Sequence, residues 1–298
     1  MRATSRLLAL PRRHGFNRIL AMTNRSFPAV FRISFGFFLA LGLLAATTRS
    51  LAAQDWAKQQ INKSPRHSEW VTVKYGGRSI QAYVVYPEVK EKAPVVLLIH
   101  EIFGLSDWMR EMTDEVAAAG YIAIAPDLLS GVGPGGGGSS SFPDQDATVK
   151  AVFGLKPEMV TADLDATADY ARKLPSANGK LAVGGFCWGG GQSFNFSTHR
   201  KDLAAAFVFY GPTPDKAALA SITAPVYGFY AGNDARITST VPATKEAMKA
   251  AGKKYEPVTY DGAGHGFMRA GQAPDASAEN KKAWEEGFKR FTTLLKGM

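Results

Sequence analysis

The sequence that decides the fold is KLAVGGFCWG, residues 180–189. Lys180–Gly184 has the apolar composition of a buried strand, and residues after Gly189 are typical of a helix. A Gly-x-nucleophile-x-Gly sequence between a strand and a helix is typical of a nucleophile elbow, a tight turn that lifts its central side chain above a sheet. We therefore predict that Cys187, the chain's one cysteine, is a nucleophile. The following helix N-terminus is expected to lower the pKa of the thiol.

Strand-like and helix-like segments alternate on both sides of this elbow. A hairpin around Gly76-Gly77 is predicted first, and repeated strand–helix units follow it. This order indicates an α/β fold with a mostly parallel central sheet, helices on both faces and an N-terminal antiparallel hairpin. The predicted strands are Trp70–Tyr75, Ser79–Tyr86, Pro94–His100, Tyr121–Ala125, Lys180–Gly184, Leu203–Tyr210, Pro225–Ala231 and Tyr255–Tyr260, and the predicted helices are Asp107–Ala119, Pro157–Leu174, Gly189–Thr198, Thr240–Ala251 and Ser277–Leu295.

The basic balance of the chain belongs to its first segment. The net charge is +9, but residues 1–52 hold eight arginines and no acid, which leaves 27 Lys and Arg against 26 Asp and Glu. The remainder is nearly neutral, so no nucleic-acid partner is expected. Residues 1–52 are interpreted as a signal peptide with Met22 as a possible true start, because the apolar run Phe35–Ala46 is short for a membrane span. An uncleaved anchor is the alternative.

Three regions follow from this interpretation. The signal peptide (1–52) precedes a polar lead-in (53–68) and a single folded domain (69–298). We expect a periplasmic or secreted protein with no stable membrane span after cleavage at Ala52 or Ala53.

Two residues that follow the elbow are candidates for its catalytic partners. His265 lies in a glycine-rich loop (GAGHGF) after one predicted strand, and Asp234 follows another in AGND. A carboxylate that accepts from an imidazole fixes its tautomer and stabilises its charged form. His199 is too far along the elbow helix to reach Cys187, and Asp261 is the nearest rival to Asp234.

A third motif, His100-Glu101-Ile102-Phe103-Gly104, ends another predicted strand. The loop in this position donates an oxyanion N–H in folds that carry an elbow. We therefore assign the oxyanion hole to the backbone N–H groups of Ile102 and Trp188. Glu101 is either a functional acid or a buried structural carboxylate that is paired with an arginine or with backbone donors.

A low-complexity stretch, Gly131–Ser141 (GVGPGGGGSSS), lies between a predicted strand and a helix. Such a position often carries a ligand-binding loop, and the alternative is a flexible insertion without a role.

The motifs HEIFG, GFCWGG, GND and GHGF, taken in this order, resemble the dienelactone hydrolase (carboxymethylenebutenolidase) family of α/β-hydrolases. The resemblance covers about Trp70 to Leu295. It implies a triad of Cys187, Asp234 and His265, and a Glu101 that contacts the resting thiol and takes its proton when substrate binds. It also implies that Arg269 binds a substrate carboxylate. Phe103 and Phe267, in the same two loops, are candidate substrate contacts.

One departure from the family lies in Gly131–Ser141, which holds no arginine where the family has a second carboxylate-binding one. The residues and the resemblance together predict a hydrolase of small esters or lactones that forms a thioester at Cys187 and uses no cofactor or metal. A catalytically inactive ligand-binding protein on the same fold is the alternative. A thiol redox protein would need a resolving cysteine, which the chain lacks.

Overall fold

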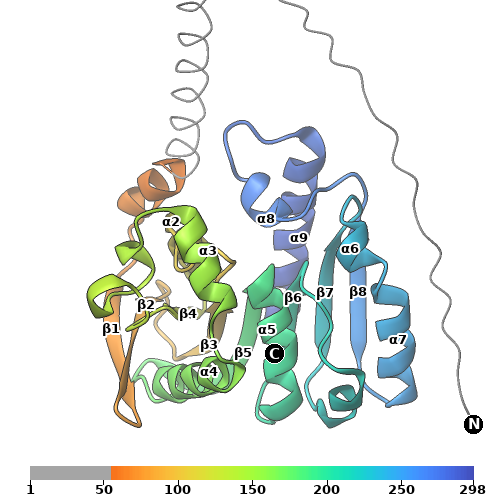
Figure 1. Ribbon diagram of the computed structural model, residues 1–298, viewed down its shortest axis with the longest axis horizontal. Helices are drawn as coiled ribbons and strands as arrows, with labels where there is room; N and C mark the ends of the chain where they lie inside the picture. Colours follow the sequence, from red (N-terminus) through yellow and green to blue (C-terminus); the bar gives the residue numbers. More distant parts are fainter. Residues whose placement is uncertain (1–54) are drawn as a thin grey trace, which may run out of the picture. The chain divides into compact units, whose positions relative to one another are not determined.

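The apolar strand residues build a single eight-stranded sheet, seen from one face in Figure 1. The computed structural model describes residues 55–298, so the predicted signal peptide lies outside the described residues. The strand order is β1-β2-β4-β3-β5-β6-β7-β8, and the pairs from β4 onward along the sheet are parallel. The strands are β1 (Ser68–Tyr75), β2 (Arg78–Val85), β3 (Ala93–Ile99), β4 (Ile122–Pro126), β5 (Ala177–Phe186), β6 (Ala205–Phe209), β7 (Val226–Ala231) and β8 (Tyr255–Tyr260).

The antiparallel hairpin forms where the sequence predicts it. β1 pairs with β2 from Ser68–Val85 to Tyr75–Arg78, and β2 then pairs antiparallel with β4. Gly76 and Gly77 both have positive φ, at 49° and 80°. A two-residue turn of this handedness matches the twist of the flanking strands and favours glycine. The predicted mostly parallel sheet with an N-terminal hairpin is thereby confirmed.

Helices cover both faces of the sheet, as expected for parallel strands. In Figure 1, α4 and α5 lie in front of the sheet and α9 lies behind it. Beyond residue 63, the α-helices are α2 (Asp107–Ala118), α3 (Gln145–Phe153), α4 (Pro157–Arg172), α5 (Trp188–His199), α6 (Ala235–Thr238), α7 (Val241–Ala250), α8 (Phe267–Ala270) and α9 (Ala278–Lys296).

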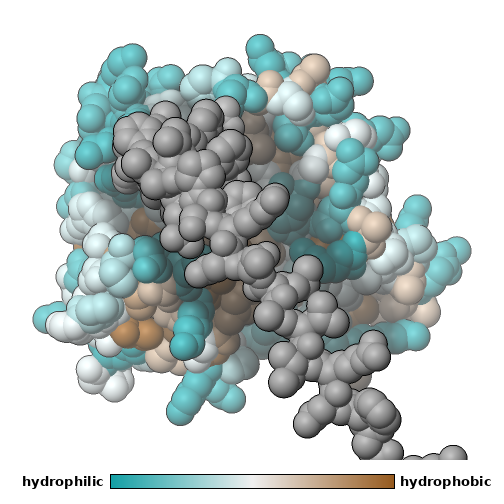
Figure 2. Space-filling model, turned by 45° about the horizontal axis from the view of Figure 1, so that its top comes forward, coloured by the Kyte–Doolittle hydropathy of each residue, from teal (hydrophilic) through white to brown (hydrophobic). Residues whose placement is uncertain are grey.

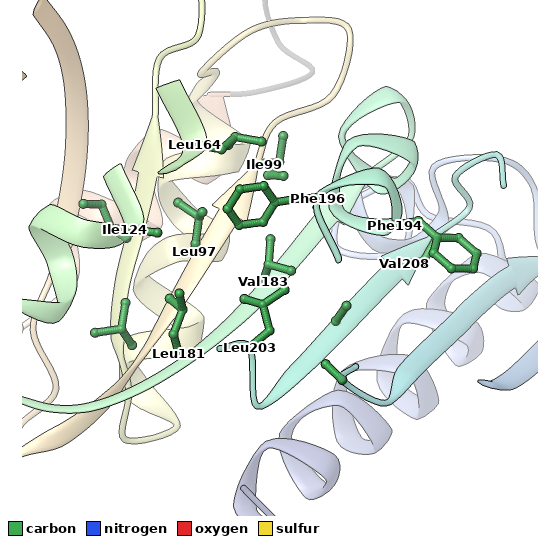
Figure 3. Close-up of a cluster of buried hydrophobic side chains, with 14 of the residues drawn as sticks. Leu97, Ile99, Ile124, Leu164, Leu181, Val183, Phe194, Phe196, Leu203 and Val208 are labelled. Atoms are coloured by element: carbon green, nitrogen blue, oxygen red, sulfur yellow. The ribbon is translucent and has the colours of Figure 1, made fainter. Parts of the chain in front are cut away.

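The core lies on both faces because the buried strands are apolar at every position. In β3, Leu97 and Ile99 face the cluster under α4 and α5, whereas Val96 and Leu98 face α2 and α9. Figure 3 shows the first cluster, in which Phe196 of α5 packs among aliphatic side chains of the strands. This two-sided burial holds the strand ends, and therefore the loops that follow them, in fixed positions.

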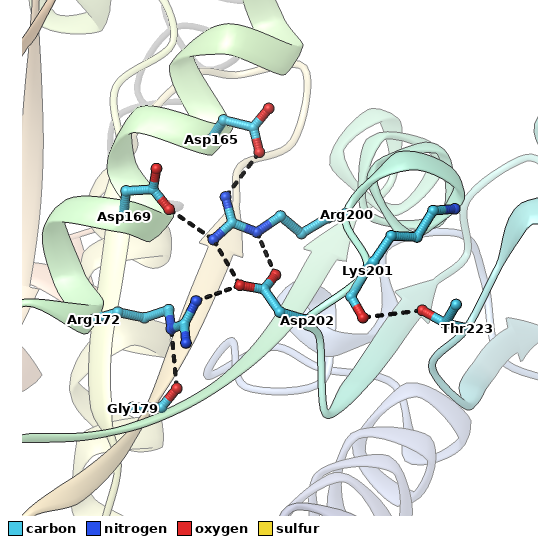
Figure 4. Close-up of polar contacts among 8 residues, drawn as sticks. All are labelled: Asp165, Asp169, Arg172, Gly179, Arg200, Lys201, Asp202 and Thr223. Carbon is cyan, nitrogen blue, oxygen red and sulfur yellow. Dashed lines mark hydrogen bonds and ion pairs between the residues drawn. The ribbon is translucent and has the colours of Figure 1, made fainter.

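An ion-pair network joins α4 to the residues that follow α5 (Figure 4). Arg200, which follows α5, contacts Asp165 (3.0 Å) and Asp169 (2.7 Å) of α4, and its Nε lies 2.5 Å from Asp202. Arg172 bonds the same Asp202. The network ties the C-terminal end of the elbow helix to its neighbour.

Within residues 55–298, four α-helical segments were not predicted. Helices α6 and α8 have only four residues each, too few to show a period. Helix α3 begins after Asp144, whose side chain accepts from the backbone N–H of Ala147 (2.8 Å). Residues 55–63, within the predicted lead-in, are also helical.

The lead-in is part of the packed structure. Ala57 is fully buried in the core cluster of α2 and α9, and Arg66 Nε donates to Asp114 of α2 at 3.0 Å. The packed region therefore extends N-terminal of residue 69, into the part of the predicted polar lead-in that the structure describes.

The surface visible in Figure 2 is mainly hydrophilic, with apolar residues in small patches. Phe153, in α3, is the most exposed of the large apolar side chains in the described range, at 65%. Between residues 55 and 298, no helix is both long and apolar enough to cross a membrane.

Candidate active site

The predicted site residues come from separate loops that meet at one edge of the sheet. Because the carboxyl ends of parallel strands lie at the same edge, the loops after β3, β5, β6, β7 and β8 gather there. They bring together Glu101 and Ile102, Cys187, Tyr210, Asp234 and His265.

The nucleophile elbow has the strained geometry that its sequence predicts. Cys187 lies between β5 and α5 with φ 56° and ψ −117°, a backbone conformation that residues other than glycine rarely adopt. A Cβ on Gly185 would lie 1.9 Å from the carbonyl oxygen of Gly189, and one on Gly189 would lie 2.4 Å from that of Ile99. The two glycines are therefore required by close backbone contact on both sides of the thiol.

The three candidate triad residues form a continuous chain of contacts. His265 Nε2 lies 3.0 Å from Cys187 Sγ, and His265 Nδ1 lies 2.5 Å from Asp234 Oδ2. Asp234 is buried, and a carboxylate beside Nδ1 fixes the Nδ1–H tautomer. The rival Asp261 is exposed, and His199 contacts Thr198 at the far end of α5.

The expected low pKa of the thiol is wrong. Burial, and after it the charge of Glu101, raise the pKa of Cys187 above its usual value to about 11. The backbone N–H groups of Trp188 and Ile102 and the guanidinium of Arg236 act in the opposite direction but are outweighed. The free site therefore favours a neutral thiol over a thiolate.

Both predicted oxyanion donors face the sulfur. The N–H groups of Trp188 and Ile102 hydrogen-bond to Cys187 and lower its pKa. They come from the first residue of α5 and from the loop after β3. Two N–H groups that converge beside a nucleophile are placed to bind an oxygen that gains negative charge.

Glu101 is paired with an arginine rather than with the thiol. Arg269 Nε donates to Glu101 Oε2 at 2.8 Å, and the hydroxyl of Tyr210 donates more weakly to Oε1 at 3.4 Å. The carboxylate is 2% exposed. Of the two roles left open for Glu101, this geometry favours the arginine-paired carboxylate, and it also places a negative charge beside Arg269.

Comparison with known proteins agrees with this geometry. The profile of the dienelactone hydrolase family matches residues 80–298. The chain belongs to the dienelactone hydrolase family. The family and the α/β-hydrolase fold inferred from the motifs are thereby confirmed, as is an enzyme of the ester and lactone hydrolase class.

Individual relatives cover most of the dienelactone hydrolase domain. A Salmonella typhi protein whose name proposes carboxymethylenebutenolidase activity is 31% identical over 228 residues, which is 72% of this chain and 83% of the relative. A Methylorubrum extorquens protein with the same name is 33% identical over 225 residues, 71% of this chain and 75% of the relative. A crystal structure from Klebsiella pneumoniae, titled as a proposed dienelactone hydrolase, aligns with a TM-score of 0.65 and 28% identity over 75% of this chain and 97% of that one.

A cavity of about 340 Å³ opens beside the thiol of this dienelactone hydrolase homologue. Phe103, a candidate substrate contact, lines it, and the guanidinium of Arg269 lies 5.1 Å from the centre of the Phe103 ring. The residues that line the cavity are Glu101, Ile102, Phe103, Phe153, Cys187, Trp188, Tyr210, Pro212, Arg236, His265 and Arg269.

Phe267 does not contact this cavity, and its assignment to substrate binding is corrected. Its ring is fully buried and packs against Tyr210 (5.3 Å between centroids) and Tyr260 (5.1 Å). Phe267 is the first residue of α8, the short helix after the His265 loop. Its side chain points into the core and not toward the carboxyl edge of the sheet. Phe267 therefore supports Tyr210 from behind.

The glycine-rich segment Gly131–Ser141 is a packed support for the oxyanion loop. Ser139 donates its N–H and its hydroxyl to Asp127 (2.7 and 2.6 Å), and its hydroxyl accepts from the N–H of Leu105 (2.9 Å). A Cβ on Gly104 would lie 2.2 Å from that hydroxyl oxygen. This packing argues against a flexible insertion without a role. No residue of Gly131–Ser141 lines the cavity beside Cys187, but four of its glycines line a separate cavity (Gly131, Gly136, Gly137 and Gly138), so ligand binding by this loop stays a prediction.

Sequence reasoning missed four cavity residues: Phe153, Tyr210, Pro212 and Arg236. Tyr210 ends a buried strand with φ 41°, and its ring packs edge-on against His265 at 5.0 Å. Arg236 follows Asp234 by two residues and forms no ion pair within the described part of the chain. The GND motif indicated that this loop belongs to the site. Arg236 lies in the cavity wall only because α6 forms a helical turn directly after Asp234.

Proposed function

We propose that this protein hydrolyses small esters or lactones with Cys187 as the nucleophile and a thioester acyl-enzyme as the intermediate. The contact that carries the proposal is the 3.0 Å distance between Cys187 Sγ and His265 Nε2. A nucleophile, an oriented base and two oxyanion donors beside one cavity are the parts that acyl transfer needs.

The acylation step follows from the raised pKa of the thiol. Because a thiol with a pKa of about 11 holds its proton at neutral pH, His265 accepts that proton as Sγ bonds to the substrate carbonyl carbon. The Asp234 carboxylate stabilises the imidazolium. The N–H groups of Ile102 and Trp188 stabilise the oxyanion.

The attack gives a tetrahedral intermediate. Its collapse breaks the carbon–oxygen bond to the alcohol part of the substrate. The leaving oxygen takes the proton from His265, and Cys187 keeps the acyl group as a thioester. His265 then removes a proton from water as the water oxygen attacks the thioester. The acid is released, and Sγ recovers its proton. In a lactone, the alcohol stays attached to the acyl group until this second step.

The cavity wall indicates a small substrate with an apolar part. Its apolar lining consists of Phe103, Phe153, Trp188 and Pro212. Arg269 is held by Glu101, whereas Arg236 is unpaired within the described residues. A carboxylate on the substrate would therefore meet Arg236 more readily than Arg269, which the family resemblance assigns to this task.

The test is turnover of p-nitrophenyl acetate by the purified protein and by Cys187→Ala. The parent is expected to release p-nitrophenol and to gain the mass of one acetyl group when quenched early, whereas the variant does neither. The alternative, a ligand-binding protein without activity, predicts no turnover and no acetylation in either protein across a panel of lactones and short esters.

A further inference from the structure

The fully buried imidazole of His100 has no place in the proposed reaction, yet it contacts the oxyanion loop. It lies at the end of β3, and its Nδ1 is 2.7 Å from the carbonyl oxygen of Glu101. A carbonyl oxygen only accepts hydrogen bonds, so Nδ1 must carry the proton. Burial lowers the pKa of His100, which keeps the ring neutral with its other nitrogen bare. Nε2 has no partner within residues 55–298.

This hydrogen bond fixes a peptide plane that belongs to the oxyanion hole. The carbonyl of Glu101 and the N–H of Ile102 are parts of the same peptide group. In a trans peptide these two groups point in opposite directions, and no cis peptide occurs in the described chain. The Ile102 N–H is one of the two backbone groups whose hydrogen bonding lowers the pKa of Cys187. Rotation of this plane would turn that N–H away from the sulfur.

The second oxyanion donor is held against the same ring. The imidazole of His100 stacks on the indole of Trp188, with centroids 5.6 Å apart and 20° between the planes. The backbone contact is also close, since a Cβ on Gly189 would lie 2.4 Å from the carbonyl oxygen of His100. One buried ring thus contacts both segments that supply N–H groups.

We propose that His100 is a positioning residue for the oxyanion hole, because its Nδ1–H holds the Glu101 carbonyl and thereby directs the Ile102 N–H at the reacting carbonyl oxygen. The inference rests on the proposed function, since an oxyanion forms only in acyl transfer. It assigns His100 no contact with substrate and no proton transfer.

Paired variants test the position of the donor. The amide nitrogen of Asn can occupy the place of Nδ1, whereas that of Gln reaches the place of Nε2, so His100→Asn keeps the donor and His100→Gln moves it. With p-nitrophenyl acetate, His100→Gln and His100→Leu should lose ~100-fold or more in kcat with KM nearly unchanged, and His100→Asn should stay within about tenfold of the parent. Thermal unfolding shows which variants are folded, and the Asn–Gln pair suffices if His100→Leu does not fold. Parent-like kcat in folded His100→Gln, or an equal loss in folded His100→Asn, would overturn the proposal.

A second measurement does not need turnover. An aryl trifluoromethyl ketone adds to Cys187: Sγ bonds to the ketone carbon, the thiol proton passes to His265, and the ketone oxygen becomes an oxyanion. Fluorine NMR should show the adduct weakened ~100-fold in His100→Gln, with unchanged affinity for the matching trifluoromethyl alcohol, which forms no oxyanion. Equal adduct affinity in the parent and His100→Gln would overturn the proposal, as would absence of an adduct in the parent. A parent that forms the adduct but turns over no ester would contradict the proposed function alone.

Discussion

Nε2 of His265 lies 3.0 Å from Sγ of Cys187, although 78 residues separate the two in the sequence. The two side chains come from loops after β8 and β5, strands that are separated in the sheet by β6 and β7. Each reaches the other only because both loops leave the same edge of the sheet. The contact sets the chemistry that the site can perform, and the prediction for Asp234 depends on it.

The raised pKa of Cys187 predicts its alkylation profile. Only the thiolate reacts with iodoacetamide, so the rate should rise about tenfold per pH unit and level off only near pH 11, the pKa of the thiol. Mass spectrometry of the intact protein measures the rate, with Cys187→Ala as the unmodified control. A rate that is already constant at pH 7 would show a preformed thiolate.

Asp234→Asn should lower kcat by about 10³–10⁴-fold, because an amide cannot stabilise the imidazolium and favours the wrong tautomer of His265. The matched control is Asp261→Asn, an exposed acid in the loop that precedes His265. It should keep parent activity. Equal losses in both variants would contradict the assignment, and a loss in Asp261→Asn alone would reverse it.

Glu101→Gln should lower the pKa of Cys187, because the charge of Glu101 is the second-largest cause that raises it. The alkylation profile should then shift to lower pH. If Glu101 instead accepts the thiol proton, as the family resemblance implies, acylation of Glu101→Gln should slow. Stopped-flow acylation rates measured together with the alkylation profile distinguish the two roles.

Arg236→Gln tests the recognition of a substrate carboxylate. For p-nitrophenyl hydrogen glutarate, kcat/KM should fall roughly 10- to 100-fold, the usual effect of removing a hydrogen bond to a charged group. The neutral methyl p-nitrophenyl glutarate should change much less. If both esters lose equally, Arg236 acts on the thiol rather than on the substrate.

The hairpin depends on a buried ion pair that Arg78→Met should disrupt. Arg78 donates to Asp163 of α4 at 2.6 and 2.7 Å, and Tyr75 donates to the same carboxylate. Asp163 is fully buried, so loss of its partner should lower the free energy of unfolding by ~3 kcal/mol or more. Arg172→Met, in the more exposed network of Figure 4, should cost about 1 kcal/mol or less. Urea denaturation measures both, and equal costs would contradict the prediction.

Local patterns in the sequence were sufficient to predict the elbow and the sheet. The spacing around Cys187 and the runs of buried strand residues depend on backbone sterics and on burial of both sheet faces, which neighbouring residues determine. The order of Cys187, Asp234 and His265 followed from the same pattern. The short helices α6 and α8 could not be predicted, because four residues show no period.

The sequence by itself determined the architecture and the family, and it named the candidate site residues that the structure brings together, since these depend on short motifs and their order. Only the tertiary structure decided the electrostatics of the site. Burial made the thiol a weak acid, Arg269 was paired with Glu101, Arg236 was left without an ion pair among residues 55–298, and Phe267 was placed in the core. Burial and pairing are properties of the space around a side chain, and loops far apart in the chain supply that space.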